Sequence, residues 1–223
     1  MGVKRRSVSG HAKGERVKAE SKGMPIQKET AMKSHLGLAA ALLLAACGAE
    51  DAGPPPAGVI ALSDQFKSDF ALIDQDGKTM TQADIKGRVG VVYFGFASCP
   101  DVCPLALGRL SAALNELAPG DREKVAPLFI TVDPGRDTPE KLKAFLAFDE
   151  RITGLTGERA AIEAAKANFK VFAEPEASAD SALGYTMQHT SFFYLIDRAG
   201  ALRVALEDTL TPAEIADAIR RTL

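Results

Sequence analysis

The sequence predicts an α/β domain in which one mixed β-sheet is flanked by helices, and three features indicate this fold. Two continuous apolar runs, 89–96 and 125–132, have the composition of strands that are covered on both faces. Each run is followed by a stretch with apolar residues at helical spacing. The chain then closes with a strand pair and a capped helix.

The elements up to the second buried strand follow from local patterns. Residues 70–80 are an apolar run broken by Asp76-Gly77, which predicts an N-terminal β-hairpin extension before the strand at 89–96. A helix is predicted next, ending at Pro119-Gly120, because leucines recur at steps of three and four residues. These leucines are Leu107, Leu110, Leu114 and Leu117.

The second half of the chain completes the sheet. Thr138-Pro139 predicts the start of a helix after the strand at 125–132, with threonine as the N-cap. Further patterns predict a helix at 160–169, a short strand at 170–173, and an antiparallel hairpin from 191–196 and 201–206. Thr211-Pro-Ala-Glu214 is a capping box that opens the last helix. This order of strands and helices is that of a thioredoxin-like domain.

The first 46 residues predict an export signal rather than a part of the fold. They carry nine Lys/Arg against three Asp/Glu, so the net charge of −2 divides into +6 here and −8 for the rest. The apolar run 36–46 is about half the ~20 residues that a membrane-spanning helix requires. Residues 1–31 are either a long n-region or lie upstream of a true start at Met32 or Met24.

Cys47 is the predicted site of lipidation. Leu44-Ala-Ala-Cys47 resembles the bacterial lipobox, in which the cysteine is acylated and becomes the new N-terminus. The sequence thus predicts an extracytoplasmic, periplasmic protein that is anchored to a membrane by lipid. A cleaved signal without lipid, or a short uncleaved anchor, would export the domain as well. Residues 47–57, with three consecutive prolines, predict a tether, and residues 58–223 predict the folded domain.

The acidic charge of the predicted domain argues against nucleic acid as a partner. The segment after residue 46 carries the net charge of −8 and shows no basic stripe with interleaved aromatic residues. Such a domain lacks the electrostatic attraction that supplies most non-specific affinity for nucleic acid.

Cys99 and Cys103 lie where the first buried strand ends and the first helix begins. We expect both to be exposed there, with a lowered pKa, because a helix N-terminus favours the thiolate. Side chains four residues apart on a helix share a face, with Cβ atoms about 5–6 Å apart. That spacing allows a disulfide after some adjustment and suits a shared metal ion at least as well, so the sequence leaves both chemistries open.

His189 is the one histidine of the predicted domain, since His11 and His35 precede the predicted cleavage point. It stands in a predicted loop just before the strand at 191–196, and a thioredoxin-type sheet brings that loop beside the cysteines. Two thiolates and one imidazole form a three-coordinate soft set that suits copper, whereas structural zinc requires a fourth ligand. Met187 is a candidate for a weak extra ligand, although core filling is the more ordinary role for such a methionine.

Three motifs resemble those of the Sco/SenC family. They are Cys99-Pro-Asp-Val-Cys103-Pro104, Asp133-Pro-Gly-Arg-Asp-Thr-Pro139, and His189-Thr-Ser followed by Tyr194-Leu-Ile-Asp197. The resemblance covers residues 60–223. Ala97 and Gln188 depart from residues that are common in the family, which affects the surroundings of the site but not the ligands.

The resemblance implies a copper chaperone rather than a turnover enzyme. It implies that Cys99, Cys103 and His189 bind one copper ion, as Cu(I) or Cu(II), and that the protein assists assembly of the CuA centre of cytochrome c oxidase. The implied partner is the copper-receiving subunit of that oxidase or another exported copper enzyme. The alternative is a thiol–disulfide oxidoreductase, with Cys99 attacking and Cys103 resolving, that reduces the cysteines of such a partner. Asp101 and Asp133 are candidates to orient the ligands. A favourable interaction with the helix dipole would explain Asp101 as well. The motif of Asp133 has a structural explanation too, because Asp137-Thr138-Pro139 can cap a helix and Arg136 can pair with a neighbouring carboxylate.

Overall fold

The computed structural model describes residues 55–179, 181 and 184–223, all of which belong to one compact unit, Glu50–Leu223. The predicted signal, the lipobox with Cys47 and most of the predicted tether lie outside the described residues. Within the described ranges, no helix has the length and apolar character needed to cross a membrane.

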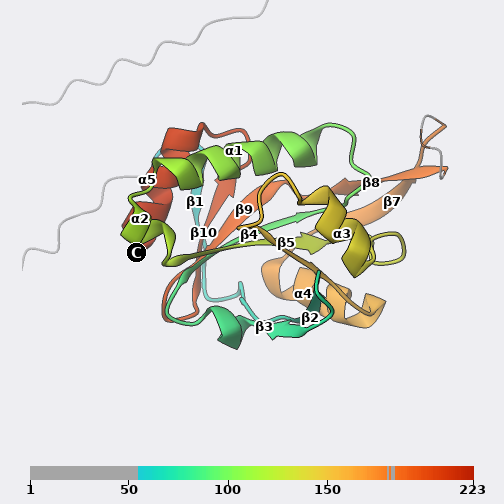
Figure 1. The fold of residues 1–223 in the computed structure, drawn as a ribbon, viewed down its shortest axis with the longest axis horizontal. Helices are drawn as coiled ribbons and strands as arrows, with labels where there is room; N and C mark the ends of the chain where they lie inside the picture. Colours follow the sequence, from blue (N-terminus) through green and yellow to red (C-terminus); the bar gives the residue numbers. More distant parts are fainter. Residues whose placement is uncertain (1–54, 180, 182–183) are drawn as a thin grey trace, which may run out of the picture. The chain divides into compact units, whose positions relative to one another are not determined.

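An eight-stranded mixed sheet forms the centre of the domain, in the order β1-β10-β9-β4-β5-β6-β2-β3 (Figure 1). Strands β4, β5 and β6 run parallel to one another, and the remaining neighbours pair antiparallel. The strands are β1 (Val59–Ala61), β2 (Ala71–Asp74), β3 (Thr79–Thr81), β4 (Val89–Gly95), β5 (Val125–Thr131), β6 (Thr153–Thr156), β9 (Phe192–Ile196) and β10 (Leu202–Glu207). With helices on both sides, this is the thioredoxin-like α/β architecture that the sequence predicts.

Helices cover both faces of this sheet. On one face, α1 (Val102–Glu116) packs against α5 (Pro212–Thr222), and on the other face Phe169 of α4 (Arg159–Phe169) packs against Phe94 and Tyr194 (Figure 1). The crossover from β5 to β6 contains α3 (Pro139–Phe145), while α2 (Pro119–Arg122) and the 3-10 helix η1 (Gln82–Ile85) are single turns.

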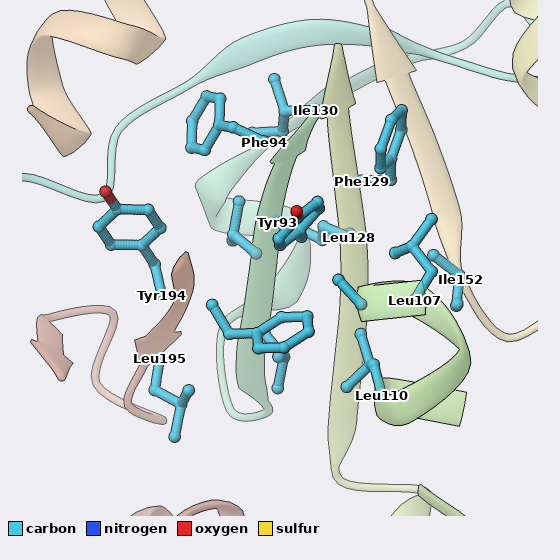
Figure 2. Packing of buried hydrophobic residues seen from close by; sticks show 14 of the residues in the cluster. Tyr93, Phe94, Leu107, Leu110, Leu128, Phe129, Ile130, Ile152, Tyr194 and Leu195 are labelled. Carbon is cyan, nitrogen blue, oxygen red and sulfur yellow. The ribbon is translucent and has the colours of Figure 1, made fainter. Parts of the chain in front are cut away.

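The core lies along β4 and β5, every residue of which is buried. In Figure 2, Phe94 and Ile130 lie together on one side of these strands, while Phe129 lies on the other side with Leu107 and Leu110 of α1. Side chains on both faces are thus excluded from water, as the unbroken apolar runs of the sequence predict.

The predicted helix starts are confirmed. The hydroxyl of Thr138 accepts a hydrogen bond from the backbone N–H of Lys141 at 3.3 Å. Thr211 and Glu214 form the predicted capping box at α5. These contacts satisfy amide groups that the first turn of a helix leaves without partners.

A separate hairpin, β7 (Ala173–Ala177) with β8 (Tyr185–His189), projects from the domain beside the main sheet (Figure 1). The prediction of a strand at 170–173 is wrong, because Lys170 ends α4 in a left-handed conformation and the strand begins at Ala173. The predicted loop position of His189 is also wrong, since it is the last residue of β8. The sequence reasoning also missed β1 and β6.

Candidate metal site

The site lies at the end of β4, where the chain turns into α1 and the base of the β7–β8 hairpin comes alongside. A tight turn follows β4, closed by a hydrogen bond from the backbone N–H of Cys99 to the carbonyl of Phe96 at 3.1 Å. Cys99 lies in this turn and Cys103 in the first turn of α1. The sequence reasoning assumed that the two cysteines share a helix, whereas only Cys103 lies in one.

Both cysteines are buried, so the expectation that they are exposed is wrong. Cys103 is 0% exposed and Cys99 is 7% exposed. The reason for the burial of Cys103 lies in Gly95, where a Cβ atom would stand 2.8 Å from Cys103 Sγ and 2.8 Å from the ring of Phe129. The absent side chain of Gly95 therefore leaves the space that the sulfur of Cys103 fills.

His189 faces Cys103. Its Nε2 lies 3.7 Å from Cys103 Sγ, while its Nδ1 lies 3.0 Å from the carbonyl oxygen of Thr190. Because a carbonyl oxygen only accepts, the proton of a neutral ring belongs on Nδ1, and the lone pair of Nε2 points toward the sulfur. The ring is also held edge-on by Tyr93 and Phe96, with centroid distances of 6.3 Å and 5.9 Å.

The distance between these two donor atoms fits a shared metal ion. Bonds of about 2.3 Å to sulfur and about 2.0–2.1 Å to nitrogen, meeting at about 120°, separate the donors by about 3.7–3.8 Å. The 3.7 Å between Cys103 Sγ and His189 Nε2 agrees with this value. The pair is therefore spaced as two ligands of a three-coordinate ion would be.

Cys99 stands beside Cys103 and differs from it in acidity. The backbone N–H of Cys103 lies 3.5 Å from Cys99 Sγ. Hydrogen bonding from the Cys103 thiol lowers the pKa of Cys99 to about 5, while the same contact, together with burial, raises the pKa of Cys103. The expectation of a lowered pKa therefore holds for Cys99 and is wrong for Cys103. Both thiols are free, so the pair is in its reduced form.

The three predicted ligands do not form a closed cage. Among the residues described from 55 onward, no group of three or more His, Cys, Asp or Glu side chains is arranged to hold a metal ion as it stands. Cys103 and His189 are in place, and Cys99 directs its sulfur toward the backbone of Cys103.

Asp101 and Asp133, the candidates to orient the ligands, lie differently from expectation. Asp101 is exposed, occupies the N-cap of α1, and makes no capping hydrogen bond with its side chain. The carboxylate of Asp133 pairs with Arg136 and accepts a hydrogen bond from the Tyr185 hydroxyl at 3.1 Å. Asp133 thus contacts the strand that carries His189 rather than the cysteines.

Asp137 supports the cysteine turn, and the sequence reasoning missed this role. Its Oδ2 accepts hydrogen bonds from the backbone N–H of Ala97 at 2.9 Å and from the Thr131 hydroxyl at 2.7 Å. The sequence indicates a helix cap at Asp137-Thr138-Pro139, and the structure shows Thr138 alone as that cap. The place of Asp137 in the connection between β5 and α3, at the same sheet edge as the cysteines, was the available signal.

A second missed residue, Asp208, lies behind the site after β10. Its carboxylate accepts a hydrogen bond from the Tyr93 hydroxyl at 3.2 Å, and Arg109 donates to its backbone carbonyl at 3.1 Å. Burial raises the pKa of Asp208, and burial also raises the pKa of Tyr93. Met187, the candidate weak ligand, packs against the apolar core.

Relatives of this chain carry Sco names. Residues 60–223 match the family described as SCO1/SenC. The chain is 41% identical over 138 residues to Protein SCO2, mitochondrial, of Saccharomyces cerevisiae, covering 61% of this chain and 46% of that protein. It is 41% identical over 133 residues to an SCO2-like protein of Rickettsia felis, and the match covers 59% of this chain and 64% of that protein. The match thus spans about half to two thirds of the length of these relatives.

Solved structures agree in fold. Bradyrhizobium japonicum ScoI with copper bound has a TM-score of 0.65 and 37% identity, covering 71% of this chain and 99% of that chain. A SCO1/SenC family lipoprotein of Bacillus anthracis has a TM-score of 0.59 and 30% identity, covering 70% and 94%. BsSco, a Sco-family cytochrome c oxidase assembly protein with an identified disulfide switch, has a TM-score of 0.57 and 25% identity, covering 73% and 96%.

The family match begins within β1 and extends to the last residue, so it includes the cysteine turn, the α3 motif and the hairpin strand that carries His189. The fold and the family match coincide over this region, and the chain belongs to the SCO1/SenC family.

Proposed function

We propose that this chain is an extracytoplasmic copper chaperone that binds one copper ion through Cys99, Cys103 and His189. The observation that carries the proposal is the 3.7 Å separation of Cys103 Sγ and His189 Nε2, with the more acidic Cys99 beside them. The B. japonicum relative has been solved with copper bound, which supports copper as the metal.

The chemistry of the donor set favours copper over zinc. Two thiolates and one imidazole are soft ligands, and Cu(I) accepts two or three of them without a fourth. Structural zinc takes four ligands in a tetrahedral arrangement. Cys99 and Cys103 are also buried, and a buried site would shield a bound Cu(I) ion from solvent.

The recipient in this proposal is a copper-binding subunit of cytochrome c oxidase, where the protein assists assembly of the CuA centre. Family membership supports this assignment, since BsSco is a Sco-family protein of cytochrome c oxidase assembly.

Attachment to the outer side of a membrane through a lipid on Cys47 is the second part of the proposal. The lipobox-like sequence ending at Cys47 supports it, and the B. anthracis relative is a lipoprotein. Two or more acyl chains give stable attachment, whereas a single chain gives only reversible binding.

Thiol–disulfide exchange with the partner's cysteines is the alternative, and the acidity of Cys99 favours it. A thiolate with a pKa of about 5 is ionised at neutral pH and can attack a disulfide of the partner, which releases one partner thiolate. Cys103 then gives up its proton and, as a thiolate, attacks Cys99 Sγ, which releases the second partner thiolate and leaves a Cys99–Cys103 disulfide. The disulfide switch identified in BsSco supports redox chemistry of such a pair.

Titration with Cu(I) against a competing chelator separates the two functions. The reduced wild type should bind one Cu(I) ion, and His189→Ala should bind it at least about tenfold more weakly. The Cys99→Ser/Cys103→Ser variant should not compete with the chelator for Cu(I). Equal affinity of wild type and the double-cysteine variant would refute the copper site. Full activity of His189→Ala in restoring oxidase assembly would favour thiol exchange, which does not need the imidazole.

A further inference from the structure

The β7–β8 hairpin cannot hold His189 in place through its own ladder. It pairs only with itself among the described strands, and an isolated two-stranded hairpin is marginally stable in water. Its register pairs His189 with Ala173 at the base and Tyr185 with Ala177 at the distal end. The orientation of the hairpin must therefore come from contacts with the body of the domain.

One face of β8 supplies those contacts. Because side chains alternate along a strand, Tyr185, Met187 and His189 share a face. All three are partly buried, with Met187 packed on the core and His189 facing Cys103. This inner face lies against the body along its whole length, so a shift at one end changes the angle at which the imidazole is presented at the other.

Arg136 fastens the distal end of this face. Its Nη1 donates to the backbone carbonyl of Tyr185 at 3.1 Å, and its guanidinium carbon lies 3.7 Å from the centre of the Tyr185 ring. Asp133 completes the clamp, since it pairs with Arg136 Nε and accepts the Tyr185 hydroxyl. The same guanidinium lies 5.8 Å from the centre of the Phe96 ring, which itself packs edge-on against His189.

The clamp is a poor device for stability alone. The side chain of Arg136 is 10% exposed and that of Asp133 is 5% exposed, so both charges have lost most of their water. Nη2 of Arg136 is buried without a hydrogen-bond partner in the described structure. A buried ion pair with an unsatisfied donor contributes little net stability, and its better-supported use is to specify one arrangement.

We propose that Arg136 is a positioning residue for His189, holding the inner face of β8 so that the imidazole remains beside Cys103. This inference rests on the proposed role of His189 as a copper ligand. Without the clamp, the hairpin samples orientations in which Nε2 points away from the sulfur. Apparent affinity falls in proportion to the fraction of molecules that remain competent.

Three variants test the clamp. Arg136→Gln removes the charge and the stacked plane, and we expect Cu(I) affinity about tenfold below wild type when roughly a tenth of the molecules remain competent. Arg136→Lys keeps the charge beside Asp133 but loses the planar contact, so its Cu(I) affinity should lie between those of wild type and Arg136→Gln. Arg151→Gln is the matched control, because Arg151 pairs with the buried Asp149 away from the site and should leave affinity unchanged.

The decisive comparison is a double-mutant cycle with His189→Ala. If Arg136 acts through the imidazole, Arg136→Gln adds no further loss of Cu(I) affinity in the His189→Ala background. An equal loss in both backgrounds would overturn the proposal. If His189→Ala binds Cu(I) as tightly as wild type, the proposed ligand set has failed. If His189→Ala weakens binding and Arg136→Gln does not, the clamp alone has failed.

A readout without copper completes the test. In the metal-free protein, amide hydrogen exchange of β8 should accelerate in Arg136→Gln and, to a lesser degree, in Arg136→Lys, while exchange in β4 and β5 remains at the wild-type rate. Unchanged exchange of the β8 amides in a folded Arg136→Gln protein would refute the clamp. If Arg136→Gln fails to fold, Arg136→Lys carries the same comparisons.

Discussion

Replacing Gly95 with alanine is expected to disturb the site from beneath. The added Cβ would stand 2.8 Å from Cys103 Sγ and 2.8 Å from a ring atom of Phe129, and both neighbours are fully buried. Neither can move into solvent, so the strain must shift α1 away from the sheet or turn the cysteine. Overpacking of this kind costs about 1–3 kcal/mol.

The net effect of Gly95→Ala is smaller than the strain. Alanine restricts the unfolded chain and returns about 0.4–1 kcal/mol, which leaves a loss between zero and about 2.5 kcal/mol. At roughly 2–4 °C per kcal/mol for a domain of this size, Tm should fall by up to about 10 °C. Cu(I) affinity should fall as well, because the sulfur that strain displaces is a proposed ligand.

Gly108→Ala is the matched control, five residues beyond Cys103 on the exposed side of α1, where an added Cβ meets no atom within 4 Å. In a helix this exchange stabilises by about 0.5–1 kcal/mol. Thermal unfolding of the reduced, metal-free proteins, followed by far-ultraviolet circular dichroism, measures the Tm of both variants. A Gly95→Ala protein that melts as high as Gly108→Ala would refute the close packing of Cys103 Sγ against Gly95.

The Cys99 thiolate should titrate near pH 5, so the rate at which it is alkylated should be level from about pH 6 to 8 and should fall below pH 6. The lowered pKa of Cys99 also contributes to folding stability. That contribution is fully present above the ordinary thiol pKa of 9.0 and is lost as the pH falls through about 5. Cys103→Ala should raise the midpoint toward the ordinary value, and an unchanged midpoint would contradict the assigned cause. Thr211→Ala should lower stability by about 1 kcal/mol through loss of the α5 cap, measured by urea unfolding, whereas Thr222→Ala at the end of the same helix should change it by no more than about 0.5 kcal/mol. Cys47→Ser should release a normally folded protein from the membrane fraction, and continued retention would point to the apolar run before it as an uncleaved anchor.

The central part of the fold was predictable because its information is local. The runs that became β4 and β5 are apolar at nearly every position, and only strands covered on both faces require that. The caps at Thr138 and Thr211 depend on contacts within one helical turn. Such features are encoded within a few residues of where they act.

The short strands were not predictable in the same way. β1 has three residues and gains its ladder only by pairing with β10, far along the chain. β7 contains Pro175 and four exposed residues, a pattern typical of a loop. β8 has polar residues on both faces, and the body of the domain rather than an apolar alternation makes it a strand. Each is defined by its partners, which a single sequence does not display.

The same distinction explains what sequence reasoning established about the site. The order of elements brings Cys99, Cys103 and the residues around His189 to one edge of the sheet, since strand ends at that edge are neighbours whatever the side chains do. Their burial was not predictable, because it depends on the space left by Gly95 beneath Cys103.

The proposed ligands rest on supports of unequal rigidity, and this inequality bears on how a cargo ion would be exchanged. Cys103 is fixed by α1 and by the strand beneath it, whereas His189 is carried by a hairpin whose distal end depends on Arg136. A copper ion bound to Cys103 and His189 could therefore lose the imidazole without any change in the core. The thiolates of Cys99 and Cys103 would still retain Cu(I). A partner that displaces His189 would meet an ion with an open coordination position. The motif that contains Arg136 would then set how readily copper is released.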